Sequence, residues 1–267
     1  MAVRIAVFGA GGKMGKAVVR AVAEAKDATL VAAVERPDFP YLAADISQLV
    51  GLGPSGVCVL DERPAKGAAD VWIDFSTPAA ALASVEAAQA AGAAMVIGTT
   101  GLLAADKDRI AAAAKAIPIV LSPNMSVGVN VMLKLVADAA ARLGPGYDIE
   151  IVEIHHRAKR DAPSGTALRL GQAAAEGSGR DFAASARYAR HGEIGPRSPT
   201  EIGVQTLRGG DVVGDHTVCF LGLGDRIEIT HRATSRDTFA RGAVRAALWL
   251  LGKKPGLFDM QDVLGLK

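Results

Sequence analysis

The residues best able to do acid–base chemistry gather in one short segment, Glu153–Leu168 (EIHHRAKRDAPSGTAL). Two of the five histidines, His155 and His156, are adjacent there, and three cations follow within four residues: Arg157, Lys159 and Arg160. Histidine and lysine can exchange protons near neutral pH. On a strand the two histidines would point to opposite faces, so we expect them to have different roles. The alternative is a basic surface loop beside a histidine that is merely buried.

The same segment contains a predicted anion site. A helix is expected to begin around Pro163-Ser164, which leaves the backbone N–H groups near Gly165 and Thr166 without partners inside the helix. Together with the neighbouring cations, these groups suit a small substrate that carries carboxylates. No Asp/His set at metal-ligand spacing surrounds the histidines, so we expect no metal.

A second candidate site is a glycine-rich turn near the N-terminus. Gly9, Gly12 and Gly15 form a GxxGxxG loop, and Gly11 adds a GxG start, although Met14 stands where a GxGxxG motif would be completed. Backbone N–H groups in such a loop can approach a pyrophosphate at the helix N-terminus. A tight turn that only packs a helix on a strand is the alternative. The position of the loop between an apolar run and a helical pattern favours a dinucleotide.

An acidic residue stands where a dinucleotide site needs one. Glu35 ends the next apolar run, 20 residues after Gly15, and can accept hydrogen bonds from the adenosine ribose. Arg36 beside it can pair with a 2′-phosphate, so the pair allows either NADH or NADPH. A solvated loop charge is the other interpretation of Arg36.

Polar, turn-forming residues follow three further apolar runs, in Asp74–Pro78, Gly98–Gly101 and Ser122–Met125. Ligands of parallel sheets bind at the carboxyl ends of strands, so these segments are expected to line the nicotinamide half of the cleft. Helix capping by Ser76, Thr77 or Ser122 is the competing explanation.

The elements that must position these residues follow from hydrophobic periodicity. Apolar runs alternate with helical patterns over the first half of the chain, which predicts an α/β domain with a parallel, helix-covered sheet: strands at 3–8, 29–34, 71–75, 95–97 and 119–121, helices at 14–26, 78–91 and 102–116. The period then changes. We expect an α+β domain over 127–235 with helices at 127–143 and 163–175, a strand at 147–155, and an antiparallel meander of strands at 201–207, 212–220 and 226–231. A final helix at 238–251 returns to the first domain, so the predicted domains are 1–126 with 236–267, and 127–235.

Composition excludes several classes of protein. With 267 residues, 50% hydrophobic and 22% charged, the chain is too apolar for a disordered protein, and its net charge of +2 gives no reason to expect nucleic acid as a partner. Cys58 and Cys219 lack CxxC spacing, and we expect two buried thiols and no disulfide framework. No signal-peptide pattern or membrane-length apolar run is present, so we expect a cytoplasmic protein with no membrane partner.

Taken together, the motifs resemble those of the dihydrodipicolinate reductase (4-hydroxy-tetrahydrodipicolinate reductase) family. The resemblance rests on the glycine loop, Glu35-Arg36, the segments at 98–101, 122–125 and 207–211, and above all 155–168. It implies a Rossmann-type dinucleotide domain, an α+β domain for substrate binding and oligomerisation, and a homotetramer. It also implies reduction of a cyclic, unsaturated dicarboxylate to tetrahydrodipicolinate with NADH or NADPH, in the pathway to diaminopimelate and lysine.

The resemblance also implies residue roles. His155 would be the proton donor or acceptor and Lys159 the proton donor, while His156, Gly165 and Thr166 would bind substrate. The implied cofactor-binding residues are Gly9, Ala10, Gly11, Gly12, Lys13, Met14, Glu35, Arg36, Gly98, Thr99, Thr100, Ser122, Pro123, Asn124 and Met125. No role is implied for residues 176–200.

Two other functions remain open at this point. A semialdehyde dehydrogenase would use a cysteine thioester, but neither Cys58 nor Cys219 lies in a strand-end motif. A non-catalytic dinucleotide sensor would keep the glycine loop but has no need of His155 and Lys159.

Overall fold

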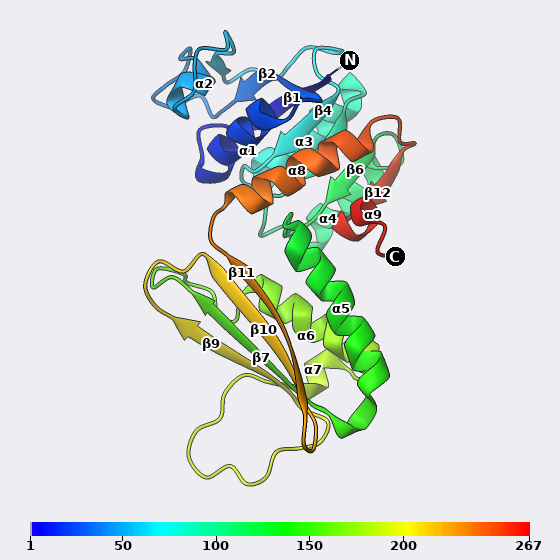
Figure 1. Cartoon of the computed structure of the whole chain (residues 1–267). Helices are drawn as coiled ribbons and strands as arrows, with labels where there is room; N and C mark the ends of the chain where they lie inside the picture. Colours follow the sequence, from blue (N-terminus) through cyan, green and yellow to red (C-terminus); the bar gives the residue numbers. More distant parts are fainter. Residues whose placement is uncertain (1) are drawn as a thin grey trace. The chain divides into compact units, whose positions relative to one another are not determined.

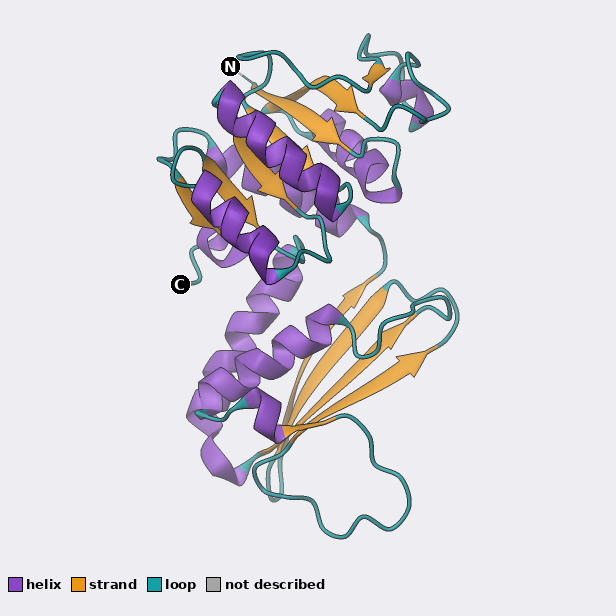
Figure 2. Cartoon of the chain, turned by 180° about the vertical axis from the view of Figure 1, so that it is seen from behind, coloured by secondary structure: helices purple, strands orange, loops and turns teal. Residues whose placement is uncertain are grey.

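The structure is a computed structural model that describes residues 2–267 and divides into two compact units (Figures 1 and 2). Unit 1 consists of Met1–Val127 and Arg236–Lys267, and unit 2 of Gly128–Ser235. Each unit has its own sheet, and each is described separately below.

Unit 1 is built on a seven-stranded sheet in which every neighbouring pair is parallel, and this confirms the predicted α/β class. The strand order is β12-β6-β5-β4-β1-β2-β3. The strands are β1 (Val3–Phe8), β2 (Ala28–Val34), β3 (Val59–Leu60), β4 (Val71–Asp74), β5 (Ala94–Ile97), β6 (Pro118–Leu121) and β12 (Gly256–Phe258).

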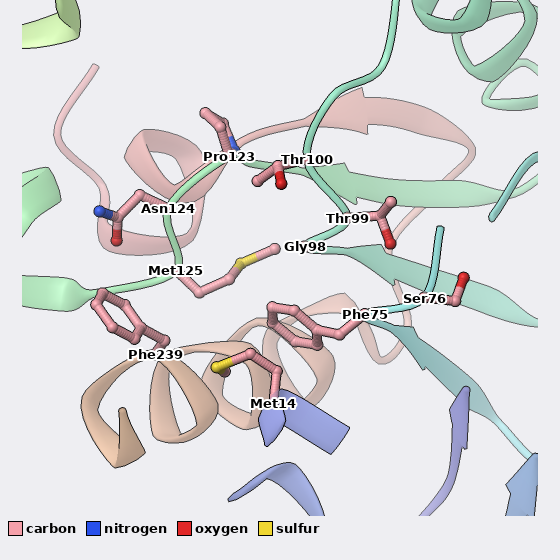
Figure 3. Close-up of a pocket in the computed structure, with 10 residues that line it drawn as sticks. All are labelled: Met14, Phe75, Ser76, Gly98, Thr99, Thr100, Pro123, Asn124, Met125 and Phe239. Carbon is pink, nitrogen blue, oxygen red and sulfur yellow. The ribbon is translucent and has the colours of Figure 1, made fainter. Parts of the chain in front are cut away.

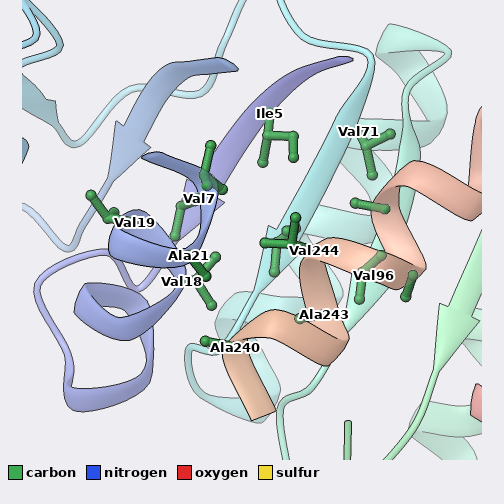
Figure 4. Packing of buried hydrophobic residues seen from close by; sticks show 14 of the residues in the cluster. Ile5, Val7, Val18, Val19, Ala21, Val71, Val96, Ala240, Ala243 and Val244 are labelled. Carbon is green, nitrogen blue, oxygen red and sulfur yellow. The ribbon is translucent and has the colours of Figure 1, made fainter. Parts of the chain in front are cut away.

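Helices cover both faces of this sheet because successive strand residues point to opposite sides. From β1, Ile5 and Val7 join a core with α1 and α8, which Figure 4 shows from close by. Ala6 and Phe8 join a second core with α3 and α4. The helices of unit 1 are α1 (Lys13–Glu24), α2 (Ile46–Leu49), α3 (Pro78–Ala91), α4 (Ala104–Ala113), α8 (Asp237–Leu250) and α9 (Met260–Leu264).

Helix α8 lies against the segment that follows β6, and a glycine makes this possible. A Cβ atom on Gly242 would overlap the backbone carbonyl oxygen of Met125. That oxygen belongs to a buried residue of the predicted cofactor segment. A side chain at 242 would therefore push the helix or this segment out of place.

Unit 2 has a five-stranded sheet in the order β11-β10-β7-β9-β8. The strands are β7 (Asp148–His155), β8 (Ala186–Arg187), β9 (Ile202–Arg208), β10 (Gly214–Leu221) and β11 (Arg226–Ala233), and the helices are α5 (Val127–Leu143), η1 (Gly144–Gly146), α6 (Gly165–Ser178) and α7 (Phe182–Ser185). Side chains from α5 and α6 share one core with β7, β9 and β10.

The predicted antiparallel meander is wrong for one of its three strands. β10 and β11 form an antiparallel hairpin, but β9 pairs with β7, in parallel. Helix α6 lies in the connection from β7, as in a crossover between parallel strands. The segment between β9 and β10 then passes around the end of β7, where Gly209 N donates to His155 O (3.0 Å) and His156 N donates to Val212 O (2.8 Å).

The segment 176–200, which carried no predicted element, contains α7 and β8 and is held by two arginines. Arg190 donates to both carboxylate oxygens of Glu150 (2.9 and 2.7 Å). Arg197 donates to Asp148 (2.6 Å) and to backbone carbonyls of Ile149 and Glu201 (3.0 and 2.8 Å). The acceptors lie up to 49 residues away in sequence, so the local sequence pattern could not indicate that these arginines hold the segment in place.

Other differences from expectation are local. The short elements α2, β3, β12 and α9 were not predicted, because they are too brief to show a period. Cys58 is exposed and Cys219 is half-buried, so the expectation of two buried thiols is wrong. Within residues 2–267, no helix combines the length and apolarity needed to cross a membrane.

We predict that Gly242→Ala destabilises the protein by about 1–3 kcal/mol, because the added methyl group meets a backbone carbonyl that cannot rotate away. The substitution should do so although alanine favours a helix over glycine by about 1 kcal/mol. Urea unfolding measures the change. Gly146→Ala is the control, since a Cβ there has open space around it. Equal stability of the two variants would contradict the close approach.

Candidate active site

The predicted dinucleotide loop joins β1 to α1, and its glycines serve two structural purposes. Gly9 has φ +69°, a conformation that favours glycine. A Cβ on Gly15 would overlap the carbonyl oxygen of Gly9, so α1 can begin directly against the turn only with glycine there. Gly12 is the N-cap of α1 and provides no side-chain cap. The first-turn N–H groups of α1 are therefore left without a side-chain acceptor, which suits an anion.

Glu35 and Arg36 lie beside this loop. The Glu35 carboxylate accepts a hydrogen bond from Gly11 N (2.9 Å). Arg36 is largely exposed and its Nε lies 3.2 Å from an oxygen of Asp38. The acid is thus held against the loop, as a ribose-binding acid requires, and the guanidinium faces solvent with only one exposed acidic neighbour among the pairs described.

A cavity of about 300 Å³ lies in unit 1 at the carboxyl ends of its strands (Figure 3). The close-up shows Phe75 and Met125 pointing toward each other across it. Phe75 and Ser76, from the segment expected at the nicotinamide half of the cleft, line the cavity, and so does Phe239, which was not predicted. The other lining residues are seven of the implied cofactor-binding residues: Met14, Gly98, Thr99, Thr100, Pro123, Asn124 and Met125. Ser122 is not in its lining; its hydroxyl donates to Asn124 O (2.8 Å) and shapes the turn.

A buried aspartate supports this end of the sheet. Asp74 has no exposed surface, and its Oδ1 accepts from Ser76 N (2.9 Å), Ser76 Oγ (2.6 Å) and Thr99 Oγ1 (2.8 Å). Among the described residues, its Oδ2 has no hydrogen-bond partner. Of the expected helix caps, Thr77 caps α3 by accepting from Ala80 N (3.4 Å), whereas Ser76 binds Asp74 instead. Asp74, Ser76 and Thr99 therefore form one network beside the cavity.

In unit 2, the predicted acid–base residue His155 contacts a carboxylate to which the sequence analysis assigned no role. Glu153 is fully buried on the helix-covered face of β7, two residues before His155. Its Oε2 lies 2.5 Å from His155 Nδ1 and accepts from Arg208 (2.8 Å). Its Oε1 accepts from Arg208 (2.9 Å), Ser164 N (3.0 Å) and Thr206 Oγ1 (3.2 Å).

These contacts determine the charge of both partners. Burial raises the pKa of Glu153, but the hydrogen bonds from Arg208 and His155 outweigh burial and bring that pKa down to about 2. Burial lowers the pKa of His155, and the hydrogen bond to Glu153 offsets this only in part. At neutral pH the pair is therefore an ionised carboxylate beside a neutral imidazole, whose Nδ1 must carry the proton that it donates.

A second histidine, His216 on β10, packs edge-on against His155 with ring centroids 5.1 Å apart. Its Nε2 lies 3.0 Å from Ser164 Oγ, which also accepts from Ala167 N (3.1 Å) as the N-cap of α6. Burial lowers the pKa of His216 to about 4, so this ring is neutral near pH 7 and shares one hydrogen bond with the serine hydroxyl. His216 thereby holds the start of α6 in place.

The remaining predicted residues lie around this centre. Lys159 is only 21% exposed, and its Nζ lies 2.9 Å from Asp161, whose pKa it lowers. His156 follows the end of β7 and is half-buried, so only His155 belongs to the strand. Gly165 and Thr166 form the first turn of α6, as predicted, and a Cβ on Gly165 would meet open space.

The residues that hold His155 in place were not predicted from the sequence, whereas His155 and Lys159 themselves were. Glu153 had one usable signal, because positions 153 and 155 share a face of a strand. Its partners Thr206 and Arg208 are 53 and 55 residues distant and reach it through the parallel pairing of β9 with β7. His216 reaches His155 through the antiparallel pairing of β10 with β7.

Comparison with known proteins assigns the chain to a family. The family described as "Dihydrodipicolinate reductase, N-terminus" matches residues 3–125, and "Dihydrodipicolinate reductase, C-terminus" matches residues 128–264. The chain belongs to the dihydrodipicolinate reductase family. The resemblance expected from the motifs is therefore confirmed over both units.

Relatives of the family match along the whole chain. The 4-hydroxy-tetrahydrodipicolinate reductase of Anaeromyxobacter dehalogenans (strain 2CP-1) is 56% identical over 265 residues, which cover 99% of this chain and 98% of the relative. The protein of that name from Geotalea daltonii is 51% identical over 266 residues, 99% of this chain and 100% of its own.

Solved structures agree on the fold. The dipicolinate-bound dihydrodipicolinate reductase from Paenisporosarcina sp. TG-14 superposes with a TM-score of 0.73 at 24% identity, covering 98% of this chain and 99% of that one. Aspartate semialdehyde dehydrogenase II from Vibrio cholerae gives 0.58 at 11% identity, covering 94% and 99%. The likeness to the second enzyme shows that family members share their fold with oxidoreductases of other chemistry.

We predict that His216 makes stability fall as the pH is lowered from about 6.5 to 4. The pKa of His216 is lowered in the folded state, so between pH 6.5 and 4 the unfolded chain is protonated at this histidine and the folded protein is not. Each unit of pKa difference between the two states changes the free energy of unfolding by about 1.4 kcal/mol. Urea unfolding at several pH values should show a shallower fall for His216→Gln than for the wild type. The exposed His191 provides the control His191→Gln, which should keep the wild-type slope. Equal slopes for His216→Gln and wild type would refute the assignment.

Proposed function

We propose that this chain reduces 4-hydroxy-tetrahydrodipicolinate to tetrahydrodipicolinate, using NADH or NADPH. The observation that carries the proposal is identity of 51–56% over essentially the full length to relatives named for this reductase activity. The site geometry supports it, because a buried carboxylate–imidazole pair, a shielded lysine and a helix N-terminus occur together in unit 2. Each of these features suits proton transfer to a small dicarboxylate.

The residues of unit 1 fit a nicotinamide dinucleotide, which supplies the hydride when bound. The uncapped first turn of α1 and the loop 9–14 would bind the pyrophosphate, and Glu35 would accept from the adenosine ribose. The cavity that includes Gly98–Thr100 and Pro123–Met125 would receive the nicotinamide, with Ser122 shaping its turn. The network around Asp74 orients Thr99, and so would hold this end of the site rigid.

In unit 2 we assign substrate binding to cations and backbone amides. The amides of Gly165 and Thr166 at the start of α6 would accept one carboxylate, and His156 would add a polar contact beside it. Lys159 is a cation, so it can stabilise negative charge that develops on the reacting ring and can donate a proton to it. His155 holds its Nδ1 proton toward Glu153, which leaves Nε2 free to accept a proton and, once protonated, to return it.

Neither alternative function gains support from the structure. Cys58 is exposed, and burial raises the pKa of the Cys219 thiol, whereas a thioester-forming nucleophile needs a thiolate. A sensor that only binds the dinucleotide leaves the hydrogen-bonded Glu153–His155 pair without a purpose.

The test of the proposed activity is a coupled assay with pyruvate, aspartate semialdehyde, the upstream synthase and NADPH, followed by nicotinamide absorbance. We expect synthase-dependent oxidation by the wild type, and a kcat lower by about 100-fold or more in Lys159→Met because its proton donor is lost. NADPH binding should be unchanged. Lys107→Met alters an exposed lysine of α4 and is the control. Oxidation that does not depend on the synthase, or full activity of Lys159→Met, would refute the proposal.

Cofactor preference depends on Arg36. Its exposed guanidinium is free to turn from Asp38 to a 2′-phosphate, so Arg36→Ala should weaken NADPH binding by about 10-fold, the effect of one charged contact, and leave NADH binding nearly unchanged. Fluorescence titration with each cofactor measures this. Equal losses for both would place Arg36 outside the phosphate site.

We also propose a cytoplasmic homotetramer formed through the open face of the sheet of unit 2, where Leu207 on β9 is an exposed apolar side chain. Light scattering should give four times the chain mass of 27.4 kDa, and cell fractionation should place the protein in the cytosol. The mass of a single chain, or recovery with membranes, would contradict these assignments.

A further inference from the structure

The carboxylate of Glu153 is completely occupied by donors. It is fully buried, and it receives hydrogen bonds from His155, Ser164 N, Thr206 and both terminal nitrogens of Arg208. These donors come from β7, β9 and the start of α6. A carboxylate with this many donors stays ionised and cannot rotate without breaking several hydrogen bonds at once. Its Oε2 is therefore a fixed acceptor for the imidazole.

The other nitrogen of His155 has a different environment. Among residues 2–267, no hydrogen bond to Nε2 is formed; the polar contact of this ring is through Nδ1. Gly214, at the start of β10, lies beside Nε2, and a Cβ on that glycine would come within 2.9 Å of it. Glycine at 214 thus avoids a side chain pressed against the nitrogen that would exchange a proton.

We propose that Glu153 is a positioning residue for His155: its Oε2 selects the Nδ1–H tautomer, so that Nε2, which lies beside Gly214, keeps a lone pair that can accept a proton. Arg208 keeps Glu153 ionised and fixes its orientation. The tautomer assignment stands on the geometry alone, whereas its consequence for turnover rests on the proposed reductase function. Glu153 does not touch substrate in this account; it acts through His155.

The charged and titratable groups that face His155 each affect its pKa. Glu153 on β7 favours the protonated imidazole, while Arg208 on β9 and Lys159, after β7, disfavour it. His216 on β10 packs against the ring and is itself neutral near pH 7. Replacing Glu153 by a neutral residue removes the one favourable charge. The pKa of His155 should then fall further below its usual value.

The first measurement is independent of turnover. In protein labelled with ¹⁵N-histidine, long-range ¹H–¹⁵N spectra distinguish the two neutral tautomers of each ring. We expect His155, assigned by its loss in His155→Gln, to carry its proton on Nδ1 in the wild type. Observation of the Nε2–H tautomer at neutral pH would overturn the inference, whether or not the protein is a reductase.

The second measurement uses kinetics of the full-length enzyme. Glu153→Gln should lower kcat by about 10- to 100-fold, within the range of a general acid–base contribution, with the KM for NADPH changed less than about two-fold. The acidic limb of the kcat/KM–pH profile should move to lower pH. Glu153→Asp keeps the charge and should restore the position of that limb, a rescue that a purely structural role would not produce.

Glu150→Gln is the matched control. Glu150 lies on the same strand and also pairs with an arginine, Arg190, but on the opposite face. It should keep the wild-type kcat and pH profile. If Glu153→Gln does not fold, Gly214→Ala tests the same geometry, since its methyl group lies beside Nε2 and should lower kcat with cofactor binding intact.

The outcomes separate the two claims. A wild type with no synthase-dependent oxidation refutes the proposed function and leaves the tautomer measurement to decide the positioning role. An active wild type whose Glu153→Gln variant keeps its kcat and pH profile overturns the inference and leaves the proposed function standing.

Discussion

The buried charge of Glu153 is the interaction on which unit 2 depends most. An ionised carboxylate with no exposed surface is costly unless donors surround it, and here strand, helix and loop residues all supply them. Because Arg208 comes from β9, the carboxylate requires β9 to lie beside β7. Because Ser164 N comes from the start of α6, it also fixes where that helix begins. The same set of hydrogen bonds thus stabilises the fold of unit 2 and fixes the orientation of His155.

The fold of unit 1 depends on helices that approach neighbouring backbone closely, and not on a buried charge. Gly15 lets α1 start against the turn after β1, and Gly242 lets α8 contact the segment after β6. Both approaches bring backbone groups to the edge of the sheet where the cavity lies. With few aromatic residues in the chain, small side chains bring helices close enough to fill the core. The cavity proposed for the cofactor therefore depends on the absence of side chains at positions 15 and 242.

Local pattern predicted most of unit 1 and only part of unit 2. The strand Val3–Phe8 and the helix Pro78–Ala91 match their predicted bounds, because each has an uninterrupted period and a clear end signal. In unit 2, the β10–β11 hairpin was visible from its turn, whereas the parallel pairing of β9 depends on contacts across more than 50 residues. The same limit applies to the candidate site: His155 and Lys159 could be predicted from residue type and spacing. Their supporting residues Arg208 and His216 become neighbours only when the strands pair.

The most direct test of the account is a crystal structure of the protein with NADPH and pyridine-2,6-dicarboxylate, a stable analogue of the proposed substrate. The account predicts one carboxylate of the analogue on the amides of Gly165 and Thr166, with Lys159 Nζ and His155 Nε2 facing the ring, and the nicotinamide in the cavity of unit 1. An analogue bound away from His155 and Lys159, or a nicotinamide outside that cavity, would contradict it.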